Sequence, residues 1–208
     1  MVASCLVLPT TASSAYQTYT YSIDGYALYS PDAYTADKVV DSAYMGLDVP
    51  IDNPGDLICD DQQNVYIADT ANNRIVVLDR YYKLKFTIST FRNGQGVMDS
   101  LSAPQGVFVS DRYIWVCDTG NNRLVEFDKK TLDFKQIIDP PESQLLADNA
   151  AYKPVAMAID PYGRIYVVSS SAHQGIIVMD PNGGFVGFIG AQAVTVSAWD
   201  ILWRKLQT

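Results

Sequence analysis

Two short polar segments hold the residues best suited to chemistry in this sequence. Asp69-Thr70-Ala71-Asn72-Asn73-Arg74 returns almost unchanged as Asp118-Thr119-Gly120-Asn121-Asn122-Arg123. In each copy the carboxylate and the amides could offer oxygen ligands to calcium. The same residue types also satisfy their own backbone in tight turns, and this is the use that we expect. The residues predicted to serve as structural turn residues are Asp69, Asn72, Asn73, Arg74, Asp118, Asn121, Asn122 and Arg123.

The sequence contains few other combinations of residues that are suited to catalysis. His173 is the one histidine, and a multi-histidine zinc site cannot be built from it. The three cysteines are scattered, so Cys59 and Cys117 are expected to be small buried hydrophobes. No nucleophile elbow or phosphate loop occurs. A channel site could use the carboxylates Asp56, Asp60 and Asp160, although turn capping explains them equally well. The sequence thus favours a protein that is not an enzyme and has no cofactor, with calcium as the weaker alternative.

The polar segments belong to a unit that occurs three times. Pro54, Pro104 and Pro154 open the copies, at a period of about 50 residues. Each copy contains four runs rich in Val, Ile, Tyr and Phe, bounded by Asp, Asn and Gly, which predict strands. The expected strands are 56–60, 65–69, 75–79 and 84–89, then 106–111, 113–118, 124–128 and 134–138, then 155–160, 165–169, 176–180 and 185–189. Four antiparallel strands per repeated unit predict an all-β fold of β-propeller blades.

The two Asp-Thr-x-Asn-Asn-Arg segments, each after a Tyr- or Trp-containing strand, resemble the NHL-repeat β-propellers. The resemblance covers about residues 53–190, and its third copy replaces the turn by Ser169-Ser170-Ser171-Ala172-His173-Gln174-Gly175. It implies protein or carbohydrate recognition outside the cell. Some similar propellers are enzymes, namely a copper- and zinc-using amidating lyase and calcium-dependent lactonases. A metal-dependent lyase or lactonase is therefore the alternative function.

The repeats divide the chain into parts. Residues 51–190 would form three blades, at about 51–100, 101–150 and 151–190. Propellers close with four to eight blades, so we expect these three to belong to a larger ring, completed by further blades or by another chain. Residues 1–15 resemble a signal peptide without its basic start, which favours a secreted or cell-surface protein. Residues 16–50 predict a Tyr-rich hairpin with a two-residue turn at Asp24-Gly25, and residues 191–208 a short helix or the start of a further region.

The net charge and the positions of the long loops indicate which classes of partner the chain could bind. The net charge is −8, which disfavours nucleic acid, and no apolar run is long enough for a transmembrane helix. The loops 91–103 and 139–153 are long for hairpins, and long loops on a rigid scaffold are common binding sites. The candidate ligand contacts on the rim are Phe91, Arg92, Arg112, Tyr113 and Tyr152. The predicted function is a binding or scaffold module for protein or carbohydrate.

Overall fold

The computed structural model describes residues 19–29, 38–142, 152–172 and 175–190, and the chain divides into two compact units, residues 1–39 and 40–208. The first unit contains the hairpin of β1 (Tyr19–Tyr21) and β2 (Ala27–Tyr29). Its turn has three residues where the sequence predicted two, because Ser22 pairs with Tyr26 through a 2.8 Å hydrogen bond. Gly25 takes the left-handed conformation (φ 80°) that ends this kind of turn. The predicted start of the first strand, residues 16–18, lies outside the described residues.

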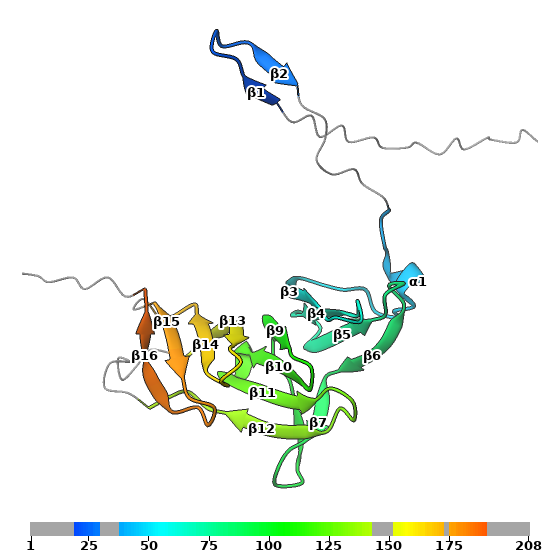
Figure 1. Ribbon diagram of the computed structural model, residues 1–208. Coiled ribbons are helices and arrows are strands. Elements are labelled where there is room, and N and C mark those ends of the chain that lie inside the picture. The colour runs from blue at the N-terminus through cyan, green and yellow to red at the C-terminus, as the bar shows by residue number, and fades with distance from the viewer. Residues whose placement is uncertain (1–18, 30–37, 143–151, 173–174, 191–208) are drawn as a thin grey trace, which may run out of the picture. The chain divides into compact units, whose positions relative to one another are not determined.

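The second unit is built from three four-stranded antiparallel sheets, which confirms the predicted fold class of β-propeller blades (Figure 1). In each sheet the strands lie in chain order, from the innermost to the outermost. Blade 1 comprises β3 (Pro54–Cys59), β4 (Val65–Asp69), β5 (Arg74–Leu78) and β6 (Leu84–Ile88). Blade 2 comprises β9 (Gly106–Val109), β10 (Tyr113–Asp118), β11 (Arg123–Asp128) and β12 (Phe134–Ile138). Blade 3 comprises β13 (Pro154–Ile159), β14 (Ile165–Ser169), β15 (Ile176–Met179) and β16 (Phe185–Ile189).

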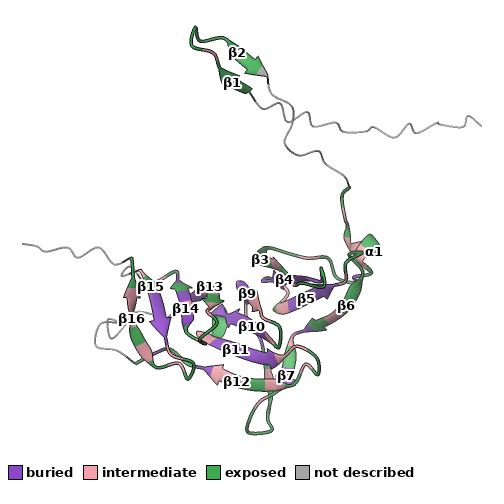
Figure 2. Cartoon of the chain, viewed as in Figure 1, coloured by how far each residue is buried: buried purple, intermediate pink, exposed green. Residues whose placement is uncertain are grey.

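The blades pack face to face with apolar cores between them. The middle strands of blades 1 and 2 consist largely of buried residues (Figure 2). We call the side of a blade that faces the preceding blade its first face, and the other side its second face. The second face of blade 1, including Tyr66 and Ile75, packs on the first face of blade 2, including Val116 and Phe127. The second face of blade 2 packs in the same way on blade 3. Because both faces of the middle strands are covered, every residue of β4 is buried.

A short segment that the sequence did not predict covers the first face of blade 1. The helix α1 (Ser42–Met45) is capped by Asp41, whose Oδ1 accepts from the Tyr44 amide at 2.7 Å, and it ends at Gly46. Leu47 follows and is 8% exposed. With Met45 and Ile51 it packs against blade 1 residues Val65, Ile67, Val76 and Leu78.

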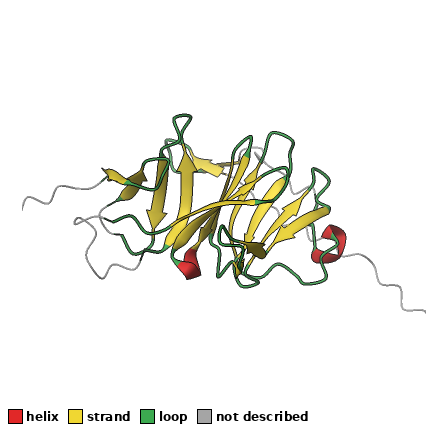
Figure 3. Ribbon diagram, turned by 90° about the horizontal axis from the view of Figure 1, so that it is seen from below, coloured by secondary structure: helices red, strands yellow, loops and turns green. Residues whose placement is uncertain are grey.

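Glycine allows the innermost strands to approach one another. The strand β9 lies beside β3 of the preceding blade and β13 of the following blade (Figure 1). Figure 3 shows the same sheets turned by 90°, with strands in yellow. A Cβ atom added at Gly55 would lie 2.6 Å from the Gln105 carbonyl oxygen. One added at Gly106 would lie 2.6 Å from the Val155 carbonyl oxygen and 2.9 Å from Cys117 Sγ. Side chains at these positions would therefore push neighbouring blades apart at the centre.

The connection between blades 1 and 2 forms a second hairpin, where the sequence predicts a loop at 91–103. Its strands are β7 (Thr90–Arg92) and β8 (Met98–Ser100). Asn93 Oδ1 accepts from the amides of Gln95 and Val97, and Gly96 is left-handed (φ 77°). The Asn93-Gly94 pair therefore marks a hairpin turn and not a loop.

Carboxylates cap the hairpin turns within the blades in the same manner. The side chain of Asp60 accepts from the amides of Gln62 and Asn64, and that of Asp160 from the amides of Tyr162 and Arg164. Asp79, Asp128 and Asp180 cap the turns before the outermost strands. These aspartates satisfy backbone donors that the turn would otherwise leave unpaired.

Candidate functional site

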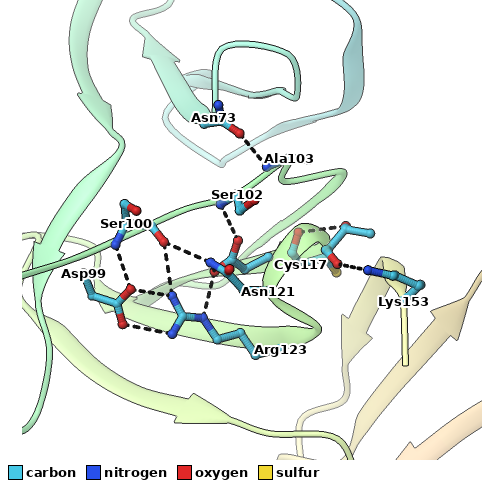
Figure 4. A network of polar contacts seen from close by, with 11 residues as sticks. Asn73, Asp99, Ser100, Ser102, Ala103, Cys117, Asn121, Arg123 and Lys153 are labelled. Atoms are coloured by element: carbon cyan, nitrogen blue, oxygen red, sulfur yellow. Dashed lines mark hydrogen bonds and ion pairs between the residues drawn. The ribbon is translucent and has the colours of Figure 1, made fainter. Parts of the chain in front are cut away.

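The turn between β10 and β11 forms the centre of a polar network (Figure 4). Asp118 has no exposed side-chain surface, and its Oδ1 accepts from the Ser102 amide at 2.7 Å. Its Oδ2 accepts from Asn121 Nδ2 at 2.9 Å and from Arg123 Nε at 2.8 Å. The turn itself is the short 3-10 helix η1 (Thr119–Asn121), and it ends at Asn122 in the left-handed conformation. The chain's own donors therefore occupy both carboxylate oxygens.

The first copy of the turn is built in the same way. Asp69 Oδ1 accepts from the Asp52 amide at 2.9 Å, and Oδ2 accepts from Arg74 Nε at 2.7 Å. Asn72 Nδ2 lies 3.0 Å from both carboxylate oxygens. Arg74 also donates to the Val49 carbonyl at 2.7 Å, so the turn holds the segment that enters its own blade. Arg74 thus contacts both a carboxylate and a backbone carbonyl.

In the third copy a serine stands where the others have aspartate. Ser169 Oγ accepts from the Lys153 amide at 3.0 Å, which is the same link between the second strand and the entry segment. No arginine follows in this turn, and His173 and Gln174 lie outside the described residues. The serine therefore keeps the backbone link and lacks the ion pair.

The threonine after each aspartate joins a blade to the next one. Thr70 Oγ1 donates to the Pro104 carbonyl at 2.7 Å, and Thr119 Oγ1 donates to the Pro154 carbonyl at 2.6 Å. Both side chains are buried. Pro154 is the first residue of the innermost strand of blade 3, and Pro104 lies just before the innermost strand of blade 2. Each threonine hydroxyl therefore fixes the next blade at the centre of the fold. We call this contact the threonine latch.

Arg123 extends the network to the β7–β8 hairpin. Its guanidinium binds the Asp99 carboxylate through two hydrogen bonds of 2.9 Å, and its Nη2 also donates to the Ser100 carbonyl. The hydrogen bonds from Arg123 hold the pKa of Asp99 below its ordinary value of 3.8 against the opposing effect of burial. The resulting stabilisation is present at neutral pH and is lost as the pH falls below 3.8.

An aromatic contact fixes the same hairpin on blade 2. The Phe91 ring stacks on Phe134 at 5.4 Å and meets the edge of Phe127 at 5.1 Å. The other side of the hairpin is open to solvent, because Val97 and Met98 are 56% and 59% exposed. A firmly anchored strand pair therefore carries an exposed apolar tip.

The five predicted rim residues do not gather at one place. Phe91 is 7% exposed and Tyr152 is 6% exposed, because both rings pack into the cores between blades. This burial removes them from the candidate ligand contacts. Arg92 lies exposed on β7, and its Nη1 donates to the Gly96 carbonyl. Arg112 and Tyr113 lie at the β9–β10 turn, at the blade end opposite the polar turns, with the guanidinium 5.5 Å from the ring centre.

The remaining asparagines of the repeat turns differ between copies. Asn73 Oδ1 accepts from the Ala103 amide at 2.7 Å and so links blade 1 to the entry of blade 2. The equivalent oxygen of Asn122 is buried and has no hydrogen-bond partner among the described residues. The hydrogen bond between Asn73 and Ala103 is therefore another link between blades 1 and 2, in addition to the threonine latch. The turn sequence alone did not predict it.

An ion pair between blades 1 and 2 lies at the other end of the sheets. Lys129 Nζ of blade 2 lies 3.0 Å from Asp60 Oδ2 of blade 1, and Tyr66 Oη donates to the same oxygen at 3.2 Å. Burial would raise the pKa of Asp60, but hydrogen bonds from Asn64 and Lys129 outweigh it and lower this pKa. Asp56 Oδ2 meanwhile accepts from the Val107 amide of blade 2 at 3.0 Å. Two of the three carboxylates considered for a channel site thus join blades.

Within the described ranges, no group of three or more His, Cys, Asp and Glu side chains gathers as metal ligands would. In the same part of the chain, no helix has the length and apolar character needed to cross a membrane. Cys117 is buried as the sequence predicted, whereas Cys59 is exposed on β3. The prediction of burial was therefore wrong for Cys59, because its side chain lies on the first face of blade 1, beyond the cover that α1 and Leu47 provide.

No protein-family model matches this sequence, and no curated protein matches it. Solved structures with a similar fold include a Bacteroides fragilis protein described as exported, with TM-score 0.52, 13% identity and coverage of 85% of this chain and 42% of that one. Kuenenia stuttgartiensis hydrazine synthase gives TM-score 0.50 and 14% identity over 66% of this chain and 36% of that one. Virginiamycin B lyase from Staphylococcus aureus gives TM-score 0.43 and 12% identity over 84% and 49%.

At these identities the similarity concerns the fold alone, and the class that it supports is the β-propeller. The chain spans less than half the length of each of these three structures.

Proposed function

We propose that this protein is a non-enzymatic propeller of the NHL-repeat type, which acts outside the cytoplasm as a binding or scaffold module for a protein or carbohydrate partner. The β7–β8 hairpin is the observation that carries the proposal. Arg123 and the aromatic pair of Phe127 and Phe134 hold its base. Val97 and Met98 are exposed at its tip. An anchored loop with exposed apolar side chains can bind a partner at little cost in conformational entropy.

The polar turns support the scaffold part of the proposal. The carboxylates of Asp69 and Asp118 are occupied by hydrogen bonds within the chain, and the arginines that follow them are engaged as well. The same geometry in both copies supports the NHL assignment. The apolar start at residues 1–15 supports export, and one of the similar folds belongs to a protein described as exported.

A binding experiment with the full chain tests the proposal. The tagged protein is applied to a glycan array and to a displayed library of extracellular peptides, beside the double variant Val97→Asp, Met98→Asp. The variant Tyr162→Asp is the matched control, because Tyr162 is 83% exposed in a turn of blade 3. We expect the wild type and the control to bind the same probes. The tip variant should lose binding by about tenfold or more, the equivalent of one or two lost apolar contacts.

The unfolding midpoint of the tip variant should stay unchanged, since both side chains lie on the surface. If the tip variant binds the probes as well as the wild type does, the binding site lies elsewhere on the protein. Turnover of a lactone or similar substrate that depends on a stoichiometric metal ion would instead support the metal-dependent enzyme.

A further inference from the structure

A hollow lies between two turns of blade 1, at the end of the blade opposite its polar turn. One wall consists of residues 61–64, in the turn between β3 and β4, and the other of residues 79–81, in the turn between β5 and β6. The hollow has a volume of about 540 Å³, and small-molecule sites have volumes of roughly 300–1,000 Å³. It is therefore large enough for a small ligand, and neither the repeat turns nor the β7–β8 hairpin contributes to it.

In blades 2 and 3 the corresponding turns lie against each other. In blade 2 the Lys129 amide donates to the Arg112 carbonyl at 2.8 Å and so joins one turn to the other. In blade 3 Gly163 faces Pro181, and a Cβ atom added at this glycine would lie 3.1 Å from Pro181 Cγ. Contact between the turns therefore fills the position that is open in blade 1.

Blade 1 has longer side chains at the two positions that meet in blade 3. Gln63 occupies the position of Gly163 and Arg80 that of Pro181, because aspartates cap the turns in the same way in both blades. Gln63 also keeps the left-handed conformation of that glycine, with φ 62°, which is unfavourable for a residue with a side chain. Since Gln63 has a Cβ atom, the turns cannot approach each other as they do in blade 3, and the hollow remains.

The first wall offers hydrogen-bonding groups that the chain itself does not use. Asp61 and Gln63 are exposed, and within the described part of the chain their side chains form no hydrogen bond or ion pair. The neighbouring Asn64 is held in place, because its Nδ2 donates to Asp60 Oδ2 at 2.9 Å and its Oδ1 accepts from Lys85 Nζ at 3.0 Å. A carboxylate that accepts and an amide that both donates and accepts therefore stand on a firmly held turn.

The second wall offers an aromatic ring and a guanidinium group. Tyr81 is 58% exposed. Arg80 Nη2 donates to Tyr81 Oη at 2.7 Å, and Arg80 Cζ lies 4.7 Å from the centre of the ring. This contact restricts both side chains, so a ligand that binds to them loses less conformational entropy. The guanidinium keeps further N–H donors for the ligand.

The groups of the two walls exclude several classes of ligand. The carboxylates of Asp61 and Asp79 disfavour phosphate and other anions, as does the net charge of −8. No aliphatic side chain of the described residues lines the hollow, so an apolar ligand would bury little apolar surface there. Asp79 Oδ1 already accepts from the amides of Tyr81 and Lys83, which makes it a poor calcium ligand.

A neutral sugar matches all of the groups that remain. Its hydroxyls both donate and accept hydrogen bonds, and the C–H face of its ring is apolar enough to pack on an aromatic side chain. We propose that the hollow of blade 1 binds a small neutral saccharide. Asp61 and Gln63 form hydrogen bonds with its hydroxyls, and Tyr81 packs on its ring. This site is distinct from the β7–β8 tip and does not depend on the function proposed for that tip.

Titration of the complete 208-residue chain with glucose, galactose and N-acetylglucosamine tests the proposal, with amide chemical shifts measured by NMR. We expect at least one of these sugars to shift the amides of residues 61–64 and 79–82 in a saturable manner. The Kd should be roughly 1–10 mM, because an open site buries only part of its ligand. The proposal is overturned if none of the three sugars shifts these amides, or if the shifts spread evenly over the three blades.

Two variants of the hollow make the result specific. Tyr81→Ala removes the ring, and Gln63→Gly removes the amide while glycine keeps the left-handed backbone, as it does at this position of blade 3. Each should weaken binding by about fivefold or more and leave the unfolding midpoint unchanged or, for Gln63→Gly, higher. Tyr162→Ala is the matched control, because Tyr162 is 83% exposed in the corresponding turn of blade 3, and it should bind like the wild type.

If both variants of the hollow bind the sugar as the wild type does, the contact is adventitious and the proposal is overturned. The tip variant Val97→Asp, Met98→Asp keeps both turns of the hollow and should bind the sugar unchanged. Its loss of partner binding is a separate result and bears on the proposed function alone.

Discussion

Asp118 shows how a single carboxylate can organise a blade. It has no exposed side-chain surface and receives hydrogen bonds from Ser102, Asn121 and Arg123. When one member of a buried, hydrogen-bonded ion pair is removed, the other charge stays buried without a partner. The resulting loss of stability is larger than the net stabilisation that the intact pair provides.

We therefore expect Asp118→Asn to lower the free energy of unfolding by about 3 kcal/mol, since the amide keeps the shape but presents a donor to Arg123. Urea unfolding followed by circular dichroism measures this change. Asp133→Asn is the matched control, because Asp133 is exposed, and it should change stability by less than about 0.5 kcal/mol. Equal effects of the two substitutions would refute the structural role of Asp118.

Glu126 has the opposite effect on stability at neutral pH. It is buried on β11, where its cross-strand partners are Trp115 and Gln136. Burial raises the pKa of this carboxyl above 4.5, although Gln136 and Lys135 partly oppose the effect. The folded protein therefore holds this proton more tightly than the unfolded chain does. The stability that this difference provides is present below pH 4.5 and is lost as the pH rises through the pKa of the folded state.

Glu126→Gln should accordingly stabilise the protein relative to the wild type at pH 7 more than at pH 4. Chemical unfolding at the two pH values provides the comparison, with Glu142→Gln, at an exposed position, as the control. A gain of the same size at both pH values would show that burial of the charge is not the cause.

At the scale of elements, the threonine latch joins consecutive blades. We expect Thr119→Val to cost about 1–3 kcal/mol, because the buried Pro154 carbonyl loses its donor while the side-chain shape is kept. Thr119→Ser retains the hydroxyl and should cost less. Hydrogen exchange adds a local readout: β13 should exchange faster in the valine variant and β4 should not. Uniform acceleration across all three blades would argue against a latch.

The close approach of the innermost strands gives another prediction. Gly106→Ala should destabilise the protein by about 1–3 kcal/mol, because the new methyl group would meet the Val155 carbonyl and Cys117 Sγ. Gly187→Ala is the matched control, since no atom lies within 4 Å of a Cβ at that position. Thermal unfolding of the two variants compares them directly, and an unaffected Gly106→Ala midpoint would contradict the close packing at the centre.

The elements differ in how far their sequence predicts them. The second strands were predicted with their observed bounds, because β-branched and aromatic runs end there at Asp or Ser turns. The helix α1 was missed because four residues show no periodicity, and β7–β8 because three-residue strands around Asn93-Gly94 resemble a loop. The latch and the Arg123–Asp99 pair join residues 24 to 35 positions apart, which local patterns cannot connect.

At the scale of the whole molecule, the three blades form a series with one covered end and one open end. The segment at Met45, Leu47 and Ile51 covers the first face of blade 1, whereas the second face of blade 3 exposes apolar side chains. The repeat turns hold the blades in this series through hydrogen bonds within the chain. We therefore assign these turns to the fold and propose that the β7–β8 tip binds the ligand.

The most direct test of this assignment is the thermal unfolding midpoint of the wild type and of Asp118→Asn, each measured with calcium and with a chelator. If the turns are structural, Asp118→Asn lowers the midpoint by several degrees and calcium leaves both midpoints unchanged. If the turns bind calcium, the ion raises the midpoint of the wild type by binding the folded state, and the gain disappears in Asp118→Asn. The second result would contradict the structural assignment of the turns and favour a metal-binding function.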